Sequence, residues 1–150
     1  MEIEKEIKQT VKFTSEYQKL SVNILYTASW ISILHVNHLK PFGLTSQQFN
    51  ILRILRGQHP NGATVNLLIE RMIDKSSNAS RLVDRLEEKG FAHRVTSVSD
   101  KRSVNVRITE KGLETLRQID EKNSFFEEKL QNLSKEEAIE TSRLLDKLRG

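Results

Sequence analysis

Small polar side chains and an arginine gather on one face of a short predicted helix between residues 74 and 90. Successive residues of an α-helix are turned by about 100°, so residues three or four apart share a face. This face comprises Ser77, Ser80, Arg81 and Asp84, and it is flanked by Ser76, Asn78 and Arg85. Small hydroxyl and amide groups allow close approach to base edges, and an arginine can donate two hydrogen bonds to one guanine. An ordinary solvated helix face has the same composition, so the neighbouring segments must decide between these two interpretations.

The helix that would present this face is marked at both ends. Asp74 has a carboxylate that can accept hydrogen bonds from first-turn amides, and Gly90 suits the left-handed position just past a helix end. The sequence therefore predicts a helix from Asp74 to Lys89. Its opposite face follows an i, i+3, i+4, i+7 spacing and is expected to be buried through Ala79, Leu82, Val83 and Leu86.

A second short helix is predicted just before this one. The Thr64 hydroxyl can cap its start. Its inward apolar residues would be Leu67, Leu68 and Met72. Only a tight turn at residues 73–75 then separates the two helices, which is the arrangement of a helix-turn-helix whose second helix enters the major groove.

After this helix the hydrophobic period changes from helical to alternating. Residues 91–98 and 104–108 alternate apolar and polar side chains, which predicts two antiparallel strands. The hairpin tip between them includes Asp100, Lys101 and Arg102. A strand pair directly after a helix-turn-helix is a wing, and an arginine at its tip can enter the minor groove of A/T-rich DNA.

The positive charge of the chain is concentrated on the same segment. The 150 residues carry a net charge of +4. Residues 75–111 hold nine lysines and arginines against five aspartates and glutamates, so the whole excess lies there and the rest of the chain is neutral. Such a concentration matches the phosphate backbone of a nucleic acid.

Further helices are predicted on both sides of this segment. The apolar spacing is helical over about residues 11–39, and a helix this long in so small a chain indicates that part of it packs on a partner chain. A capping box at residues 45–48 begins a helix that ends at Gly57. Its inward residues would be Phe49, Leu52 and Leu55. Beyond the wing, Thr109 can cap a helix that is expected over residues 110–131, and a second capping box at residues 134–137 begins the last one.

Composition and motifs argue against several classes of protein. Cysteine is absent, which excludes disulfides and thiolate metal sites, and no apolar run approaches the ~18 residues of a membrane span. The acidic N-terminus does not resemble a signal peptide, so we expect a cytoplasmic protein. There is no glycine-rich phosphate loop and no nucleophile elbow, so we expect no enzymatic activity and no cofactor.

Two histidines raise the question of a metal site. His35 and His38 are three residues apart and can share a helix face, but His59 and His93 lie in other segments. Without a further set of ligands we interpret His35 and His38 as helix-surface or interface residues, and we expect no metal.

Three stretches together resemble the MarR family of transcriptional regulators. They are Ser80–Gly90 followed by Arg94, Asp100–Ser103, and Ile108–Gly112. The resemblance implies a mainly α fold with a small β-hairpin wing, in which N- and C-terminal dimerisation helices flank a winged helix-turn-helix. It also implies a homodimer joined through the first helix and the last two. Such a dimer places two recognition helices in successive major grooves of a pseudo-palindromic operator, about 34 Å apart.

The resemblance also implies which residues contact DNA. The expected DNA-binding set is Ser76, Ser77, Asn78, Ser80, Arg81, Arg85, Arg94, Asp100, Lys101 and Arg102. Among these, the three serines and Arg81 would face bases, while Arg85 and Arg94 would either contact phosphates or support the wing. Arg102 would enter the minor groove, and Asp100 would either orient it by an ion pair or simply form the turn.

Some members of the family bind small aromatic or phenolic effectors that release DNA. Here Tyr26, Trp30 and Phe49 could line such a pocket, between the long first helix and the DNA-binding lobe. The alternative interpretation is that these three aromatic side chains pack in the core or in the dimer interface.

Residues 1–150 are therefore expected to form a single MarR-type domain. Its DNA-binding lobe would span about residues 44–110, and its dimerisation helices about 7–39 and 110–149. We expect a sequence-specific regulator, most consistent with a ligand-responsive repressor that binds double-stranded DNA as a homodimer. Two alternatives remain open: a non-specific or architectural DNA-binding protein, and a winged-helix module that binds another protein.

Overall fold

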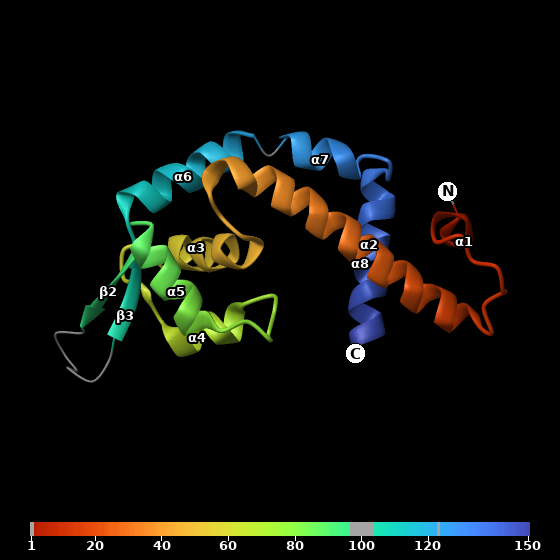
Figure 1. Ribbon diagram of the computed structural model, residues 1–150, viewed down its shortest axis with the longest axis horizontal. Coiled ribbons are helices and arrows are strands. Elements are labelled where there is room, and N and C mark those ends of the chain that lie inside the picture. Colours follow the sequence, from red (N-terminus) through yellow and green to blue (C-terminus); the bar gives the residue numbers. More distant parts are fainter. Residues whose placement is uncertain (1, 97–103, 123) are drawn as a thin grey trace.

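The fold is mainly helical with one small sheet, as the sequence predicts. The computed structural model describes residues 2–96, 104–122 and 124–150. The elements in chain order are α1 (Ile3–Glu6), α2 (Glu16–Leu39), the 3₁₀ helix η1 (Lys40–Phe42), α3 (Ser46–Gln58), β1 (Ala63–Thr64), α4 (Val65–Arg71), α5 (Ala79–Glu88), β2 (Ala92–Thr96), β3 (Val104–Ile108), α6 (Glu110–Glu121), α7 (Ser124–Leu130) and α8 (Lys135–Arg149). A lobe containing α3, α4, α5 and the strands lies at one side of the molecule, and α1 and α8 lie at the other (Figure 1).

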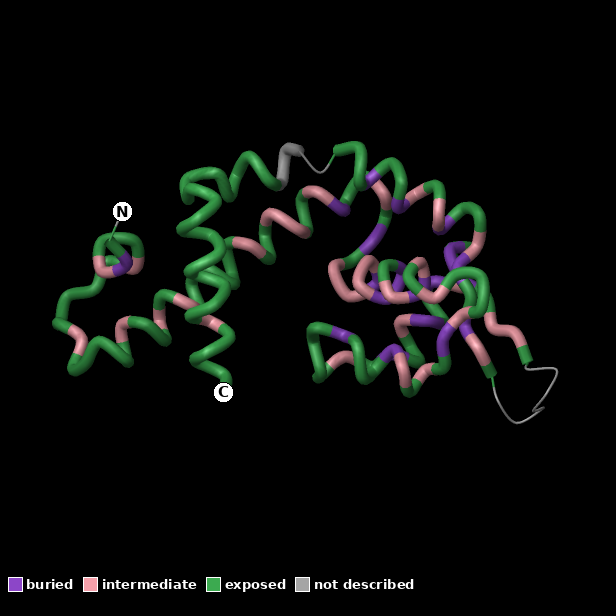
Figure 2. Tube along the Cα trace, turned by 180° about the vertical axis from the view of Figure 1, so that it is seen from behind, coloured by how far each residue is buried: buried purple, intermediate pink, exposed green. Residues whose placement is uncertain are grey.

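A buried apolar core holds this lobe together. Its fully buried side chains come from every helix of the lobe and from the sheet: Leu52, Leu55, Leu68, Val83, Leu86, Val106 and Leu116. Figure 2 shows the buried residues concentrated here, whereas the described residues of α2, α7 and α8, the outer helices, are largely exposed. The predicted apolar stripe of α5 is confirmed, because Ala79, Val83 and Leu86 are buried and Leu82 packs against the same core.

Three antiparallel strands form the sheet, in the order β1-β3-β2. The predicted hairpin is confirmed, with Arg94 of β2 opposite Val106 of β3. The third strand, β1, was not predicted; it is two residues long and pairs Ala63 with Val106. The order leaves β2 at an edge of the sheet, next to α5.

The predicted N-caps are confirmed at four helices. In each case a side-chain oxygen accepts a hydrogen bond from the backbone amide three residues later, and the capping residues are Thr45, Thr64, Thr109 and Ser134. The complete capping boxes predicted at Thr45 and Ser134 also form, with Gln48 and Glu137 accepting in return from the cap amides.

The predicted start of the recognition helix is wrong. α5 begins at Ala79, and its N-cap is Asn78, whose Oδ1 accepts from the amide of Arg81 at 3.0 Å. Asp74 instead accepts from the backbone amide of Ser76, two residues on, which forms a local turn that competes with helix. The connection between α4 and α5 is therefore longer than the predicted turn at residues 73–75.

Two other helix predictions need correction. The first long helix begins at Glu16, because the Ser15 side chain caps it, and the short helix α1 precedes it with Ile3 buried. The helix expected over residues 110–131 is divided into α6 and α7. Leu116 and Ile119 bury α6 in the lobe core, whereas residues 127–130 of α7 are exposed, so the two segments lie in different environments.

The outer helices expose many large apolar side chains. On α2, α7 and α8 these include Leu25, Tyr26, Trp30, Ile33, Val36, Leu130, Ile139, Leu144 and Leu148. Within the described part of the chain, no helix combines the length and the apolar character of a membrane span.

Candidate nucleic-acid interface

The helices α4 and α5 form the helix-turn-helix, and β2 and β3 extend from it toward the tip of the wing (Figure 1). Because its apolar stripe is buried, α5 turns the opposite face outward. The exposed side chains of that face are Ser80, Arg81, Asp84, Arg85 and Glu88. Hydroxyl, guanidinium and carboxylate groups thus alternate along one side of a short helix, next to the wing.

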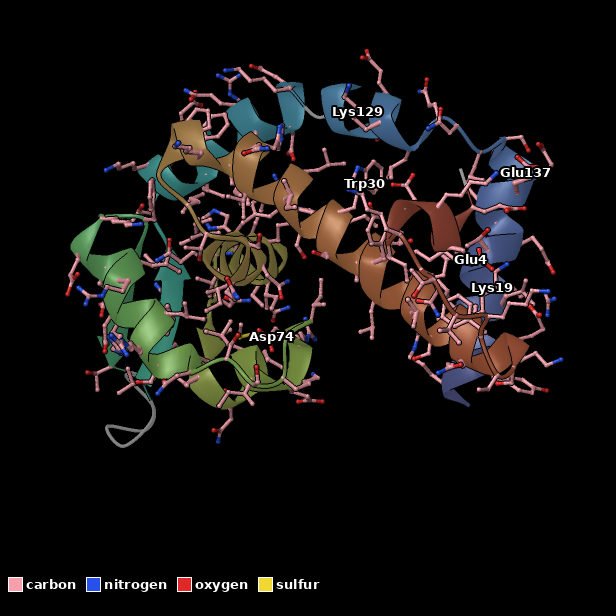
Figure 3. The ribbon with its side chains drawn as sticks, turned by 45° about the vertical axis from the view of Figure 1, so that its right-hand side comes forward. Glu4, Lys19, Trp30, Asp74, Lys129 and Glu137 are labelled. Carbon is pink, nitrogen blue, oxygen red and sulfur yellow. The ribbon has the colours of Figure 1, made fainter. Side chains whose placement is uncertain are left out.

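The turn before α5 is organised by Asp74, labelled in Figure 3. Its Oδ1 accepts from the hydroxyl of Ser76 at 2.6 Å and from the amide of Ser76 at 3.0 Å. These bonds, with a smaller contribution from the Ser77 hydroxyl, hold the pKa of Asp74 below its ordinary value. The amide of Ile73 donates to Asn50 Oδ1 at 2.9 Å, which ties the turn to α3. Ser76 and Ser77 therefore lie in the turn, not on the first turns of the helix as predicted.

Among the described cations of this face, the guanidinium of Arg81 is the most accessible to a binding partner. Its backbone amide is held by Asn78, but its side chain is exposed and forms no hydrogen bond or ion pair with any of the described residues. It lies in the first turn of α5, beside the exposed Ser80. A guanidinium in this position can reach a partner outside the chain without first breaking a contact with another described residue.

Neighbouring cations in the segment are held by the protein itself. Lys75 Nζ lies 3.4 Å from the carbonyl oxygen of Ile69 and also contacts that of Glu70, so it sits at the C-terminal end of α4. Lys89 donates to the carbonyl oxygen of Gly43 at 2.6 Å. Arg85 pairs with Glu88 at 2.7 Å, an exposed contact that a phosphate could replace.

Arg94 is the most strongly held of these cations. Its guanidinium pairs with Asp84 at 2.7 Å and with Glu87, both on α5. Partial burial alone would lower the pKa of Arg94, but the two carboxylates outweigh it and raise the pKa above its ordinary value. Of its two predicted roles, these contacts favour support of the wing over phosphate binding. Glu87 was not among the predicted site residues; its spacing of i+3 from Asp84 was the signal that could have identified it.

The predicted residues of the wing tip, Asp100, Lys101 and Arg102, lie outside the described residues. Their roles stay predictions. The strands that carry the tip are described, and β2 is attached to α5 through Arg94.

The Thr-Glu-Lys-Gly stretch at residues 109–112 has a structural role. The Thr109 hydroxyl donates to the carbonyl oxygen of Gly90, and Lys111 Nζ donates to that of Lys89, both at 2.7 Å. A Cβ atom on Gly112 would lie 2.5 Å from the carbonyl oxygen of Phe91, so the close approach of α6 requires glycine there. This stretch fixes the end of α5 against the start of α6.

The three candidate effector residues lie on two helices, Tyr26 and Trp30 on α2 and Phe49 on α3. The Tyr26 hydroxyl donates to Glu6 of α1 at 3.0 Å, and Trp30, labelled in Figure 3, is partly exposed on α2. Phe49 packs against the lobe core, with the guanidinium carbon of Arg53 5.9 Å from its ring centre. A shared pocket for these aromatic residues stays a prediction.

The histidine pair sits where α2 approaches α3. Partial burial, and then the charges of His38 and Arg53, lower the pKa of His35. Among the described residues, no group of three or more histidine, cysteine, aspartate or glutamate side chains is arranged to hold a metal ion.

Comparison with known proteins gives the same fold. The MarR family model matches residues 44–104. The transcriptional repressor MprA of Escherichia coli is 32% identical over 81 residues, which are 54% of this chain and 46% of that protein. The chain thus spans about half the length of the curated relatives it matches first.

Solved structures match over most of their length. The organohalide-sensing regulator RdhR, crystallised with 2,4-dichlorophenol, has a TM-score of 0.81 at 25% identity, with 94% of this chain and 86% of that chain covered. A mutant MarR from E. coli, complexed with operator DNA, has a TM-score of 0.78 at 25% identity, with 92% and 99% covered.

Proposed function

We infer from the match of residues 44–104 to the MarR family model that the chain is a member of this family, and we propose that it regulates transcription by binding a specific DNA operator as a homodimer. The observation that carries this proposal is the exposed face of α5. It offers to a major groove Ser80 and an Arg81 side chain that has no partner among the described residues, while the other described cations near it are anchored within the protein. Such a protein acts where the chromosome is, so we propose the cytoplasm as its location.

The proposed contacts divide into two kinds. Ser80 and Arg81 would contact base edges, and Ser76, Ser77 and Asn78 would approach the backbone from the turn at the start of α5. Arg85 could exchange Glu88 for a phosphate, because an exposed ion pair costs little to break. Lys101 and Arg102 would contact the adjacent minor groove from the wing. The operator-bound MarR mutant supports this arrangement by its similarity to the present chain.

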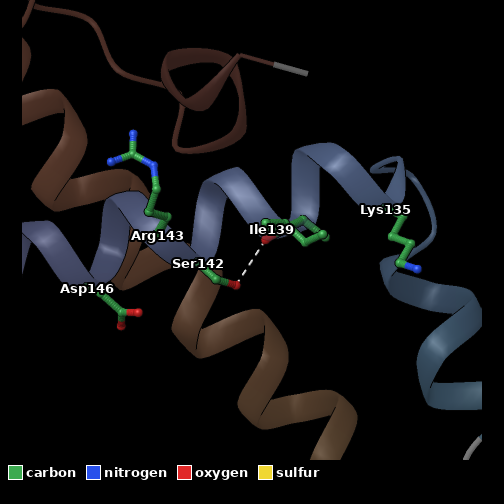
Figure 4. A pocket seen from close by; sticks show the side chains of 6 residues that line it. Lys135, Ile139, Ser142, Arg143 and Asp146 are labelled. Carbon is green, nitrogen blue, oxygen red and sulfur yellow. Dashed lines mark hydrogen bonds between the residues drawn. The ribbon is translucent and has the colours of Figure 1, made fainter.

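We propose that a second copy of the chain packs against the exposed apolar side chains of α2 and α8. α2 and α8 each expose several large apolar side chains to water, and α8 lies away from the DNA-binding lobe (Figure 1). Figure 4 shows one side of α8, where Ile139 lies near Ser142 and Arg143 in a shallow hollow of the surface. Apolar contacts rimmed by charge are typical of a dimer interface.

We also propose that a small aromatic or phenolic molecule weakens DNA binding, as expected of a ligand-responsive repressor. The similarity to a regulator crystallised with 2,4-dichlorophenol supports this class of ligand. Tyr26, Trp30 and Phe49 are the proposed contacts, and α2, which carries the first two, continues through η1 toward the lobe. A ligand held there could change the distance between the two recognition helices of a dimer.

The experiment that tests the function is selection of bound sites from a random duplex pool, with light scattering on the free protein and its complex. We expect a dimer and a recovered motif with two-fold symmetry, its half-sites about one helical turn apart. The recovered duplex should compete at least ~10³-fold better than random duplex.

Other results would favour the alternatives. Recovery of no motif, with tight binding to any duplex, would indicate an architectural DNA-binding protein. A monomer that binds no duplex even at low ionic strength would exclude the proposal and favour a winged-helix module that binds protein.

A further inference from the structure

Among the described residues, Arg94 joins the strand β2 to α5 by ion pairs. Its guanidinium contacts Asp84 and Glu87, and its Nη2 lies 3.4 Å from the carbonyl oxygen of Ser80. These three partners are successive residues of one side of α5. A strand of the wing is thus fixed to the recognition helix along two of its turns.

Glu87 holds this residue twice. Besides the ion pair, its Oε1 accepts from the backbone amide of Arg94 at 2.7 Å. The order β1-β3-β2 leaves β2 with a strand on one side only, and here the carboxylate replaces the missing neighbour on the other. Glu87 therefore fixes the main chain of the wing strand as well as its side chain.

The electrostatics of this cluster argue against a simple phosphate contact for Arg94. One guanidinium is shared by two carboxylates, and the side chains of Arg94 and Glu87 are only 29% and 30% exposed. Together the three side chains carry one net negative charge beside the proposed DNA-binding face. In isolation that charge would repel a phosphate backbone, so the cluster must contribute through geometry if it favours DNA binding.

We propose that Glu87 is a positioning residue for DNA binding. Through Arg94 it sets the angle between α5 and the strand β2, so that the recognition helix and the wing can contact one duplex together. The inference rests on the proposed function, which it deepens.

The proposal predicts an effect opposite in sign to that of charge alone. Glu87→Ala removes a negative charge near DNA, so charge alone predicts tighter binding. Loss of the wing's attachment predicts weaker binding instead, by about tenfold, because a charge-assisted hydrogen bond contributes roughly the free energy of one decade. The matched control is Glu88→Ala, which makes the same charge change on the same helix and frees Arg85. Its affinity should equal or exceed that of the wild type.

The experiment measures affinity for the selected duplex, labelled with fluorescein, by anisotropy. Wild type, Glu87→Ala and Glu88→Ala are each tested with and without Arg102→Ala. If Glu87 acts through the wing, Arg102→Ala should cost far less in the Glu87→Ala background than in the other two. Circular dichroism verifies that each variant is folded, and Glu87→Gln, which keeps an acceptor for the Arg94 amide, replaces Glu87→Ala if that variant unfolds.

Each outcome decides between the explanations. Binding by Glu87→Ala as tight as that of Glu88→Ala would overturn the inference, as would an undiminished cost of Arg102→Ala in its background. In either case wild-type binding would leave the proposed function intact. A wild-type protein that binds no duplex would instead overturn the function and this inference with it.

Discussion

Thr109 joins the end of the recognition helix to the start of α6: its hydroxyl donates to the carbonyl oxygen of Gly90 at 2.7 Å and accepts from the amide of Gly112 at 3.1 Å. Gly90 has a φ of +75°, so the chain reverses there in a left-handed conformation that favours glycine. The amide of Thr109 also donates to the carbonyl oxygen of Phe91 at 3.0 Å. Two stretches that are about twenty residues apart in the sequence are thus joined beside the proposed DNA-binding face.

We expect Thr109→Val to lower the free energy of unfolding by about 1–2 kcal/mol, because it removes a helix cap and a side-chain hydrogen bond together. Urea denaturation followed by circular dichroism measures the change. Thr115→Val is the matched control, since the Thr115 hydroxyl only donates to a carbonyl of its own helix, that of Lys111. Equal losses in the two variants would contradict a special role for Thr109.

Local signals in the sequence predicted much of this fold. Hydroxyl residues at Thr45, Thr64, Thr109 and Ser134 each marked a helix start, because a cap is satisfied within three residues and needs no tertiary contact. The start of α5 was missed since two cap residues compete there. Asp74 accepts a hydrogen bond from the amide of Ser76 and does not cap the helix. Asn78 caps it instead, by accepting from the amide of Arg81.

Features that depend on distant contacts were not predictable in the same way. The strand β1 exists only because Ala63 meets Val106 across the sheet, and α1 is held by the buried Ile3 and by an ion pair of Glu4 with Lys19. The different roles of the cations also depend on such contacts. Sequence alone showed where they cluster, but only the fold distinguishes Arg81 from those anchored within the protein.

Arg81→Ala should weaken binding to the selected operator by about 1–3 kcal/mol and relax the base preference at one position of each half-site. The reason is that its side chain has no partner among the described residues and can donate to a guanine edge, whereas alanine donates nothing. Competition with operators substituted at single positions measures the effect. Arg117→Ala, which removes the same charge from α6, is the control and should leave base preference unchanged. Equal losses on operator and random duplex would argue against direct contact with bases.

Trp30 is the only tryptophan of the chain and is partly exposed, so its emission reports on its surroundings. If it lines an effector pocket, a substituted phenol should change its emission and weaken operator binding over the same concentration range. If it lies in the dimer interface instead, emission should change on dilution and not with the phenol. A panel of phenols that alters neither emission nor affinity would leave the pocket without support.

Arg102→Ala should weaken operator binding and also flatten its salt dependence. A cation placed at the minor groove displaces condensed counterions, so its loss should reduce the slope of log affinity against log salt by about one per subunit. Anisotropy titrations from low to moderate salt give that slope for the wild type and the variant. Arg117→Ala controls for the change in overall charge, which acts at long range and should leave the slope nearly intact. A slope that Arg102→Ala does not change would mean that the wing tip stays clear of the duplex, and Arg81 would then be left as the main cationic contact.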